Sequence, residues 1–265
     1  MFNATINRAF KNKFFFFAVL IGTVSGLMGL VSYHQDVQFS LAAGHLENIS
    51  AYSAWLYCLS LGSGSIFRVI VPLLVALPFA DSLLRDKKIG YQNYILTRTS
   101  YRHFFLTRVL VNGLVGGSTV VLPMLIWLII SFVVYPANLP IKNLNYLLAD
   151  PMAGVFYGGT PIFYILILIL MGFVFGFLYA SFSLGMSGFT TNRYVVIASS
   201  FLLYLILLLV SQAMQIRSLI PLLLITPYEA YPISSFNIIA QFLLIFFITL
   251  SLLSGTYRQG REDLS

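Results

Sequence analysis

The chain has 265 residues, of which 59% are hydrophobic and only 9% are charged. Soluble globular domains carry about 25% charged residues, so this composition excludes a soluble domain with an ordinary hydrated surface. The net charge of +7 does not indicate nucleic-acid binding, because the basic residues stand in short groups beside apolar segments, where they orient the chain and meet anionic lipid. Cys58 is the only cysteine, which rules out a disulfide within the chain.

The first residues have the pattern of a helix that lies on a membrane surface. Phe2, Ile6 and Phe10 recur every four residues and therefore share one helical face. The basic residues off that face are Arg8, Lys11 and Lys13. We predict an interfacial helix over residues 1–13, with a frayed basic N-terminus as the alternative. Residues 1–32 look like a signal peptide, but the apolar run is long and no clear cleavage site follows, so we expect a retained first helix.

Six apolar stretches predict an all-α, polytopic membrane protein that forms a single transmembrane domain. They cover residues 14–33, 65–80, 109–134, 161–183, 194–214 and 236–254. A membrane-spanning helix needs about 20 predominantly apolar residues, which several of these stretches supply. The second is the shortest and follows a half-apolar segment, which leaves open a start before residue 65. Three Gly-x-x-x-Gly pairs predict close helix packing; they are Gly22–Gly26, Gly113–Gly117 and Gly172–Gly176.

The lysines and arginines between these stretches predict the orientation. Twelve of the 15 fall at the termini or in the loops after the second and fourth spans, whereas the alternate loops hold only Lys142 and Arg217. Short cytoplasmic loops carry an excess of Lys and Arg, so we expect both termini in the cytoplasm. Arg68 lies inside the second span, where it either extends to the outer headgroups or lines a path and meets an anionic substrate group.

The most informative loop is the cytoplasmic region over residues 81–108. Leu84, Tyr91 and Ile95 can share a helical face, and four charged residues surround it: Arg85, Asp86, Lys87 and Lys88. Gly90 interrupts this element, and Ser100 can cap a new helix that leads into the third span. We predict an exposed amphipathic helix that transmits force to a cytoplasmic partner; the alternative is a basic loop that only fixes the topology.

This arrangement resembles the type-2 ABC exporter permeases, and looks closest to the small permeases of bacterial antibiotic-resistance and bacteriocin-immunity exporters. That family has six spans, an N-terminal interfacial helix and a cytoplasmic coupling helix between spans two and three. The residues that look like its coupling pattern are the charged cluster of Asp81, Arg85, Asp86, Lys87 and Lys88, then Gly90, Ile95 and Leu96, Ser100 with Arg102, and Arg108. The family often has a glutamate shortly before the glycine, whereas Lys88 and Ile89 stand there in this chain.

A second point of resemblance is the segment 215–235, because the family commonly has a short re-entrant hairpin between spans five and six. The sequence SLIPLLLITP within it is too short to span a membrane and too apolar for a free loop. The resemblance implies a partner interface formed by Leu84, Arg85, Asp86, Lys87, Lys88, Gly90, Tyr91, Ile95 and Arg98. It also implies separate ATPase subunits that bind ATP and Mg²⁺, and pairing with a second copy or a related permease.

Motifs for chemistry within the chain itself are missing from the sequence. No GxxxxGK[ST] phosphate-binding loop occurs, and the three histidines (His34, His45 and His103) fall outside the predicted spans. We therefore expect a transport subunit without catalytic residues, cofactor or metal of its own. Its substrate would be amphipathic or lipid-like, because the spans offer few polar side chains. The alternative is a membrane accessory or assembly protein that binds partners and transports nothing; a membrane enzyme ranks third.

Overall fold

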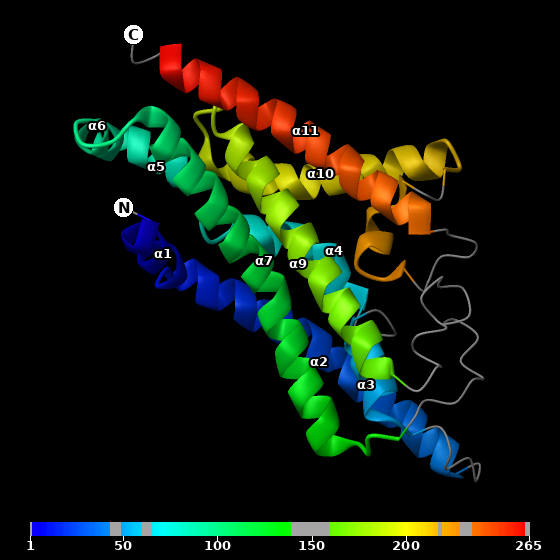
Figure 1. Cartoon of the computed structure of the whole chain (residues 1–265). Coiled ribbons are helices and arrows are strands. Elements are labelled where there is room, and N and C mark those ends of the chain that lie inside the picture. The colour runs from blue at the N-terminus through cyan, green and yellow to red at the C-terminus, as the bar shows by residue number, and fades with distance from the viewer. Residues whose placement is uncertain are drawn as a thin grey trace.

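The computed structural model describes residues 2–42, 49–59, 65–138, 160–216, 219–227 and 235–262, and these residues are almost entirely helical. Five helices among them are long and apolar enough to cross a membrane. They are α2 (Lys13–Ala42), α7 (Tyr101–Val134), α9 (Pro161–Met186), α10 (Arg193–Ala213) and α11 (Ser235–Glu262). Each matches one predicted span, and most extend beyond the predicted bounds. The chain is an all-α, polytopic membrane protein (Figure 1).

The second predicted span, over residues 65–80, differs from the prediction. Its helix, α4 (Ser65–Ala76), ends early. The turn that follows contains Pro78, and a proline disfavours the helical backbone conformation at the residue before it. At 1.5 Å per residue α4 is about 18 Å long, which is short of the roughly 30 Å hydrocarbon core. A separate helix, α3 (Ala51–Leu59), precedes it within the half-apolar segment before residue 65.

Helix α3 is a buried part of the bundle. Trp55 is fully buried, and its indole nitrogen donates to the carbonyl oxygen of Met124 in α7 at 2.9 Å. Residues 60–64 separate α3 from α4 and lie outside the described residues. Two short helices, α3 and α4, therefore share the apolar residues of the half-apolar segment before residue 65 and of the predicted second span.

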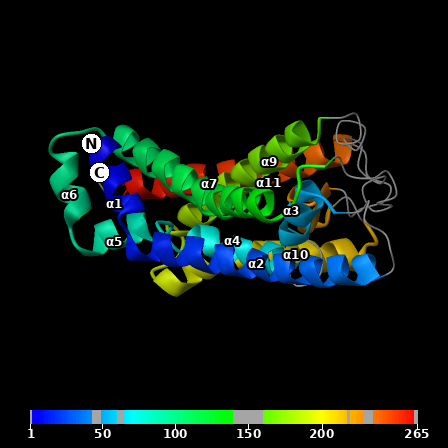
Figure 2. The ribbon, with the colours of Figure 1, turned by 90° about the horizontal axis from the view of Figure 1, so that it is seen from below.

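Short helices gather at the end of the molecule that carries both termini (Figures 1 and 2). Helix α1 (Phe2–Phe10) is amphipathic, as predicted for the interfacial helix, and Ile6 and Phe10 pack on a cluster that includes Phe79 and Val111. Helices α5 (Ser82–Lys88) and α6 (Tyr91–Leu96) follow α4 and connect it to α7. Ser100 caps α7 as predicted, because its hydroxyl accepts from the backbone N–H of His103 at 3.4 Å.

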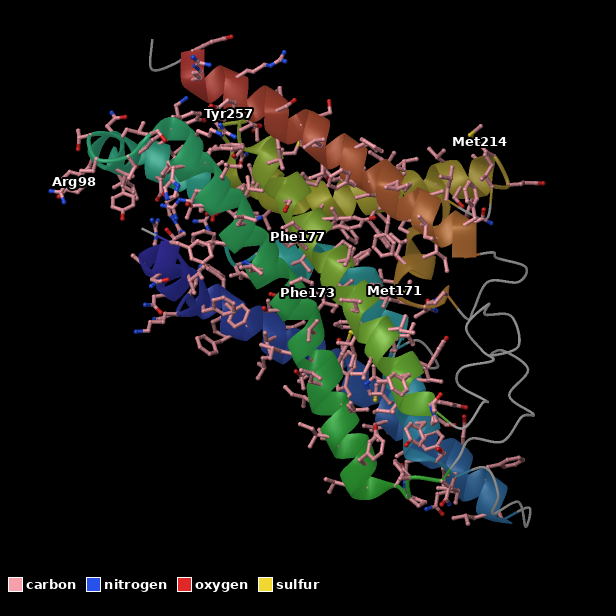
Figure 3. All side chains as sticks on the ribbon, in the orientation of Figure 1. Arg98, Met171, Phe173, Phe177, Met214 and Tyr257 are labelled. Atoms are coloured by element: carbon pink, nitrogen blue, oxygen red, sulfur yellow. The ribbon has the colours of Figure 1, made fainter. Side chains whose placement is uncertain are left out.

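Helices α7 and α9 form the closest pair in the bundle, and the predicted glycine pairs lie in their contact. A Cβ atom added at Gly176 would lie 2.6 Å from the backbone oxygen of Gly116, so only glycine allows the two backbones to approach this closely. Phe173 and Phe177 of α9 lie over Gly117 and Gly113 of α7 at this crossing (Figure 3). The pair Gly22–Gly26 of α2 likewise makes room for Pro123 and Trp127 of α7.

The segment expected to re-enter the membrane, 215–235, is packed into the bundle where it is described. A 3-10 helix, η5 (Pro221–Leu224), is followed by Ile225, and both Leu224 and Ile225 are buried in the main apolar core. Gln241 of α11 donates from Nε2 to the carbonyl oxygen of Leu219 at 3.1 Å. Residues 217–218 and 228–234 lie outside the described residues, as do Lys142 and most of the predicted loop 135–160.

Candidate functional site

The candidate site is the α5–α6 element, which corresponds to the predicted cytoplasmic region. Gly90 separates the two helices and has a φ of 75°, in the left-handed region that favours glycine. The interruption predicted at Gly90 is therefore confirmed. It also corrects the expected single face: Leu84 lies in α5 before the break, whereas Tyr91 and Ile95 lie in α6 after it, so the three do not share one helical face.

The two halves of the element differ in burial. Four of the seven residues of α5 are buried, among them Leu84 and Asp86, whereas no residue of α6 is fully buried. Both residues were expected to face a partner, Leu84 as an apolar anchor and Asp86 in a charged rim. The structure corrects this expectation for Asp86, whose side chain is fully covered by the rest of the chain, whereas Leu84 is 8% exposed and lies in the wall of a cleft.

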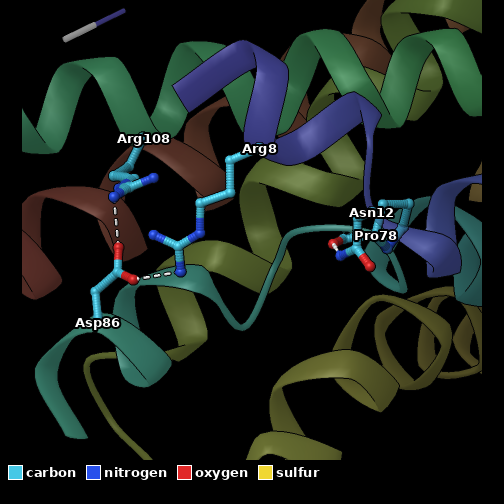
Figure 4. A network of polar contacts seen from close by, with 5 residues as sticks. All are labelled: Arg8, Asn12, Pro78, Asp86 and Arg108. Carbon is cyan, nitrogen blue, oxygen red and sulfur yellow. Dashed lines mark hydrogen bonds and ion pairs between the residues drawn. The ribbon is translucent and has the colours of Figure 1, made fainter. Parts of the chain in front are cut away.

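The buried carboxylate of Asp86 is compensated by two ion pairs (Figure 4). Its carboxylate, with no exposed surface, lies 2.6 Å from Nη2 of Arg8 in α1 and 2.5 Å from Nη2 of Arg108 in α7. Arg108 is only 1% exposed, and its guanidinium lies over the rings of Phe79 and Phe104 at 5.5 and 5.2 Å from their centroids. A buried carboxylate needs such partners, since an uncompensated charge in this environment is strongly unfavourable.

Further polar contacts fix the base of the element to its surroundings. Asn12, between α1 and α2, donates from Nδ2 to the carbonyl oxygen of Pro78 at 2.5 Å (Figure 4). Lys88 donates from Nζ to the carbonyl oxygen of Thr191 at 2.9 Å, and Asp81 lies 3.6 Å from Nη2 of Arg193. Helix α5 is therefore tied to α1, to α7 and to the connection between α9 and α10.

Helix α6 and the turn before it present large side chains on the outside. Ile89, Tyr91 and Tyr94 are 72%, 41% and 60% exposed. Arg98 is exposed, extends away from the helical body (Figure 3), and its guanidinium lies 5.2 Å from the ring centroid of Tyr94. We call Ile89, Tyr91, Tyr94 and Arg98 the α6 surface. A cleft of about 290 Å³ separates it from Ala4 and Thr5 of α1.

The α6 surface includes two of the predicted interface residues, Tyr91 and Arg98. Sequence reasoning missed Ile89 and Tyr94, although Tyr94 follows Tyr91 by three residues, a spacing that places both on one side of a helix. Of the other predicted residues, Ile95 is half-buried against a cluster around Phe104 and Phe105. Arg85 is half-buried, and Lys87, Lys88 and Gly90 are exposed.

A second cleft lies on the other side of α5. Its volume is about 550 Å³, and it is bounded by α5, by the connection between α9 and α10, and by the last turns of α11. Leu84, Lys87 and Lys88 line it together with Phe189 and Gln259. Three of the predicted interface residues thus face this cleft and not the α6 surface, so the predicted set is divided between two sides of the element.

Arg68 lies away from this end of the molecule, in α4. Its side chain is half-buried, and Nη1 donates to the hydroxyl of Thr226 at 3.4 Å, just after η5. The structure thus places the arginine within reach of the segment expected to re-enter the membrane. Neither of the two roles considered for Arg68 is decided by this contact.

Among the residues that the structure describes, no cluster of His, Cys, Asp and Glu has the arrangement of a metal site. The α5–α6 element carries exposed aromatic and aliphatic side chains next to a helix anchored by buried ion pairs. No family model, curated protein or solved structure matches this chain.

Proposed function

We propose that this chain is the membrane subunit of an ATP-driven exporter of the ABC type, and that separate ATP-hydrolysing subunits dock on the α6 surface. The observation that carries the proposal is the contrast within α5–α6: Tyr91 and Tyr94 are exposed, while Asp86 beneath them is tied to two other helices. Exposed aromatic side chains are the usual energetic anchors of protein interfaces. A firmly attached base lets force applied at the surface reach the spans.

In this proposal the chain catalyses nothing itself. ATP and Mg²⁺ bind to the partner subunits, whose closure displaces α5–α6, and the displacement repacks the spans around an amphipathic or lipid-like substrate. Two copies of the chain, or one copy and a related permease, complete the exporter. The α7–α9 contact, built on Gly116 and Gly176, is tight enough for these two helices to move together.

The second candidate is an accessory or assembly protein that uses the same α6 surface to bind a partner without transport. The exposed residues of the α6 surface favour this candidate equally, because they indicate that a partner binds and do not indicate whether transport follows. The two candidates separate on one observation: a co-purifying subunit with a phosphate-binding loop and ATPase activity supports the exporter, whereas a partner without ATPase activity supports the accessory role.

The docking surface leads to a first prediction. Replacing Tyr91 and Tyr94 together by alanine should weaken binding of the ATPase subunit by about 2–4 kcal/mol, because each anchor contributes on the order of 1–2 kcal/mol. That corresponds to a loss of roughly thirtyfold or more in affinity. Co-purification and stimulated ATPase activity should fall together, while the amount of inserted chain stays unchanged. Quantitative pull-down from detergent extracts measures the effect.

The control is Tyr194→Ala, since Tyr194 is a 73% exposed tyrosine in α10, outside the α6 surface. This variant should bind the ATPase subunit as the wild-type chain does. Undiminished co-purification and transport by the Tyr91→Ala, Tyr94→Ala variant would show that the α6 surface is not where the ATPase docks.

The orientation of the chain in the membrane gives a second prediction, because it decides on which side of the membrane α6 lies. Cysteines introduced as Asn3→Cys and Arg261→Cys, both at exposed positions, should resist membrane-impermeant thiol reagents in intact cells. Both should react once the membrane is opened. Cys58 is buried and should stay silent, so the native thiol does not interfere. Labelling of either terminal position from outside the cell contradicts cytoplasmic termini.

A further inference from the structure

Helix α1 contacts the docking element through Arg8, whose side chain reaches both halves of that element. Arg8 pairs with Asp86 of α5 at 2.6 Å, and its guanidinium also lies 5.3 Å from the ring centroid of Tyr91 in α6. Tyr91 belongs to the α6 surface, whereas Asp86 is buried beneath it. Arg8 thus connects the exposed surface to the buried ion pairs.

The two arginines that hold Asp86 are not equivalent. Arg108 is almost completely buried between Phe79 and Phe104, so a partner that covers α6 removes almost no water from it. The side chain of Arg8 is 34% exposed. A partner that covers Tyr91 also displaces water from Arg8, which lowers the local dielectric constant and strengthens the attraction between Arg8 and Asp86. Docking at α6 therefore acts more directly on the half-exposed Arg8 pair than on the buried Arg108 pair.

Movement of α1 has a direct route into the membrane domain. Only Lys11 and Asn12 separate α1 from α2, and Asn12 is bonded to Pro78 in the turn before α5. A change in how firmly α1 is held is thus passed on to the start of a long apolar helix as well as to the base of the element.

Building on the proposed function, we propose that Arg8 is a positioning residue that makes α1 part of the coupling apparatus: a subunit docked on the α6 surface tightens the Arg8–Asp86 pair, and α1 and the start of α2 then move with α5–α6. Arg108 supplies the permanent attachment of α5 to α7. The N-terminal helix responds to docking, and does not merely rest on the membrane surface.

Hydrogen–deuterium exchange of the α1 amides tests this, with Arg8→Gln, Arg8→Lys and Lys11→Gln as variants. In the chain alone, the amide hydrogens of α1 should exchange at least about tenfold faster in Arg8→Gln than in wild type, because a charge-assisted contact is lost. Arg8→Lys keeps the charge and should retain most of the protection. Lys11→Gln, an exposed change one turn along, should match wild type. Equal exchange in Arg8→Gln and wild type overturns the proposal.

The second measurement adds the subunit that co-purifies with the tagged wild-type chain. Docking should further protect α1 in wild type and in Lys11→Gln, and should leave α1 of Arg8→Gln unprotected while that variant still retains the subunit. If docking protects α1 equally in Arg8→Gln, Arg8 is only a structural contact and the inference is wrong. If no ATP-hydrolysing subunit co-purifies, the proposed function fails, and exchange in the isolated chain still decides whether Arg8 holds α1.

Discussion

Replacing Asp86 by asparagine is expected to lower the free energy of unfolding by about 3–5 kcal/mol, the usual cost of removing one partner from a buried ion pair. The substitution leaves Arg108 buried between two phenylalanine rings without a counter-charge, and it leaves Arg8 without its anion. The amide is close in size to the carboxylate, so the loss reports charge more than packing. Unfolding in mixed detergent micelles, followed by helical signal, measures it.

Two variants make this expectation specific. Asp36→Asn changes an exposed carboxylate in α2 that accepts a hydrogen bond from Tyr57, and it should cost less than about 1 kcal/mol, as exposed charges usually do. Adding Arg108→Gln to Asp86→Asn should recover part of the lost stability, because the orphaned buried charge is removed as well. A double variant that is less stable than wild type by the sum of the two single losses contradicts a direct interaction between Asp86 and Arg108.

Replacing Gly176 by valine is expected to separate α7 from α9 and to cost about 3 kcal/mol, near the upper end for an overpacked core. The new Cβ would lie 2.6 Å from the backbone oxygen of Gly116, and backbone cannot rotate away as a side chain can. The variant should therefore unfold at a lower concentration of denaturing detergent, and its yield of folded protein should be lower. Size-exclusion profiles and unfolding midpoints measure both effects.

Gly172→Ala is the matched control, one turn away on the same helix. Its Cβ would lie 3.0 Å from Sδ of Met124, the flexible part of a side chain that can move aside. This variant should retain nearly wild-type stability. If Gly176→Val unfolds at the same midpoint as Gly172→Ala, the close α7–α9 approach does not contribute to stability.

Much of the fold was predictable, because long apolar stretches have few alternatives to a membrane helix. Five of the six predicted spans, the amphipathic helix at the N-terminus, the cap at Ser100 and the interruption at Gly90 all follow from patterns within about 20 residues. The early end of α4 and the burial of α3 were harder to anticipate. The half-apolar segment left open an earlier start of the second span, but no local pattern indicates that the indole of Trp55 bonds to Met124, 69 positions later.

The sequence predicted where along the chain the candidate site lies, but not which contacts its residues make. Residues 82–98 were identified, yet Asp86 was assigned to an exposed rim because its sequence neighbours are Arg85 and Lys87. Its true neighbour Arg8 is 78 positions away, and no local pattern reports such a pairing. Helical spacing also placed Leu84 on one face with Tyr91. That spacing assumes one continuous helix, whereas Gly90 ends α5 and changes the direction of the chain before α6.

The order of synthesis gives the Arg8–Asp86 pair a consequence for assembly. At about 5–20 residues per second, Asp86 emerges roughly 4–16 s after Arg8, and Arg108 follows within a further few seconds. During that interval the residues on which α1 packs in the finished fold are absent, and we expect its apolar side chains to lie among the lipid headgroups, where an amphipathic helix is stable. The face with Ile6 and Phe10 thus acts twice, first holding the nascent chain at the bilayer and later packing against Phe79 and Val111. A polar replacement of Ile6 should therefore impair insertion as well as the finished fold.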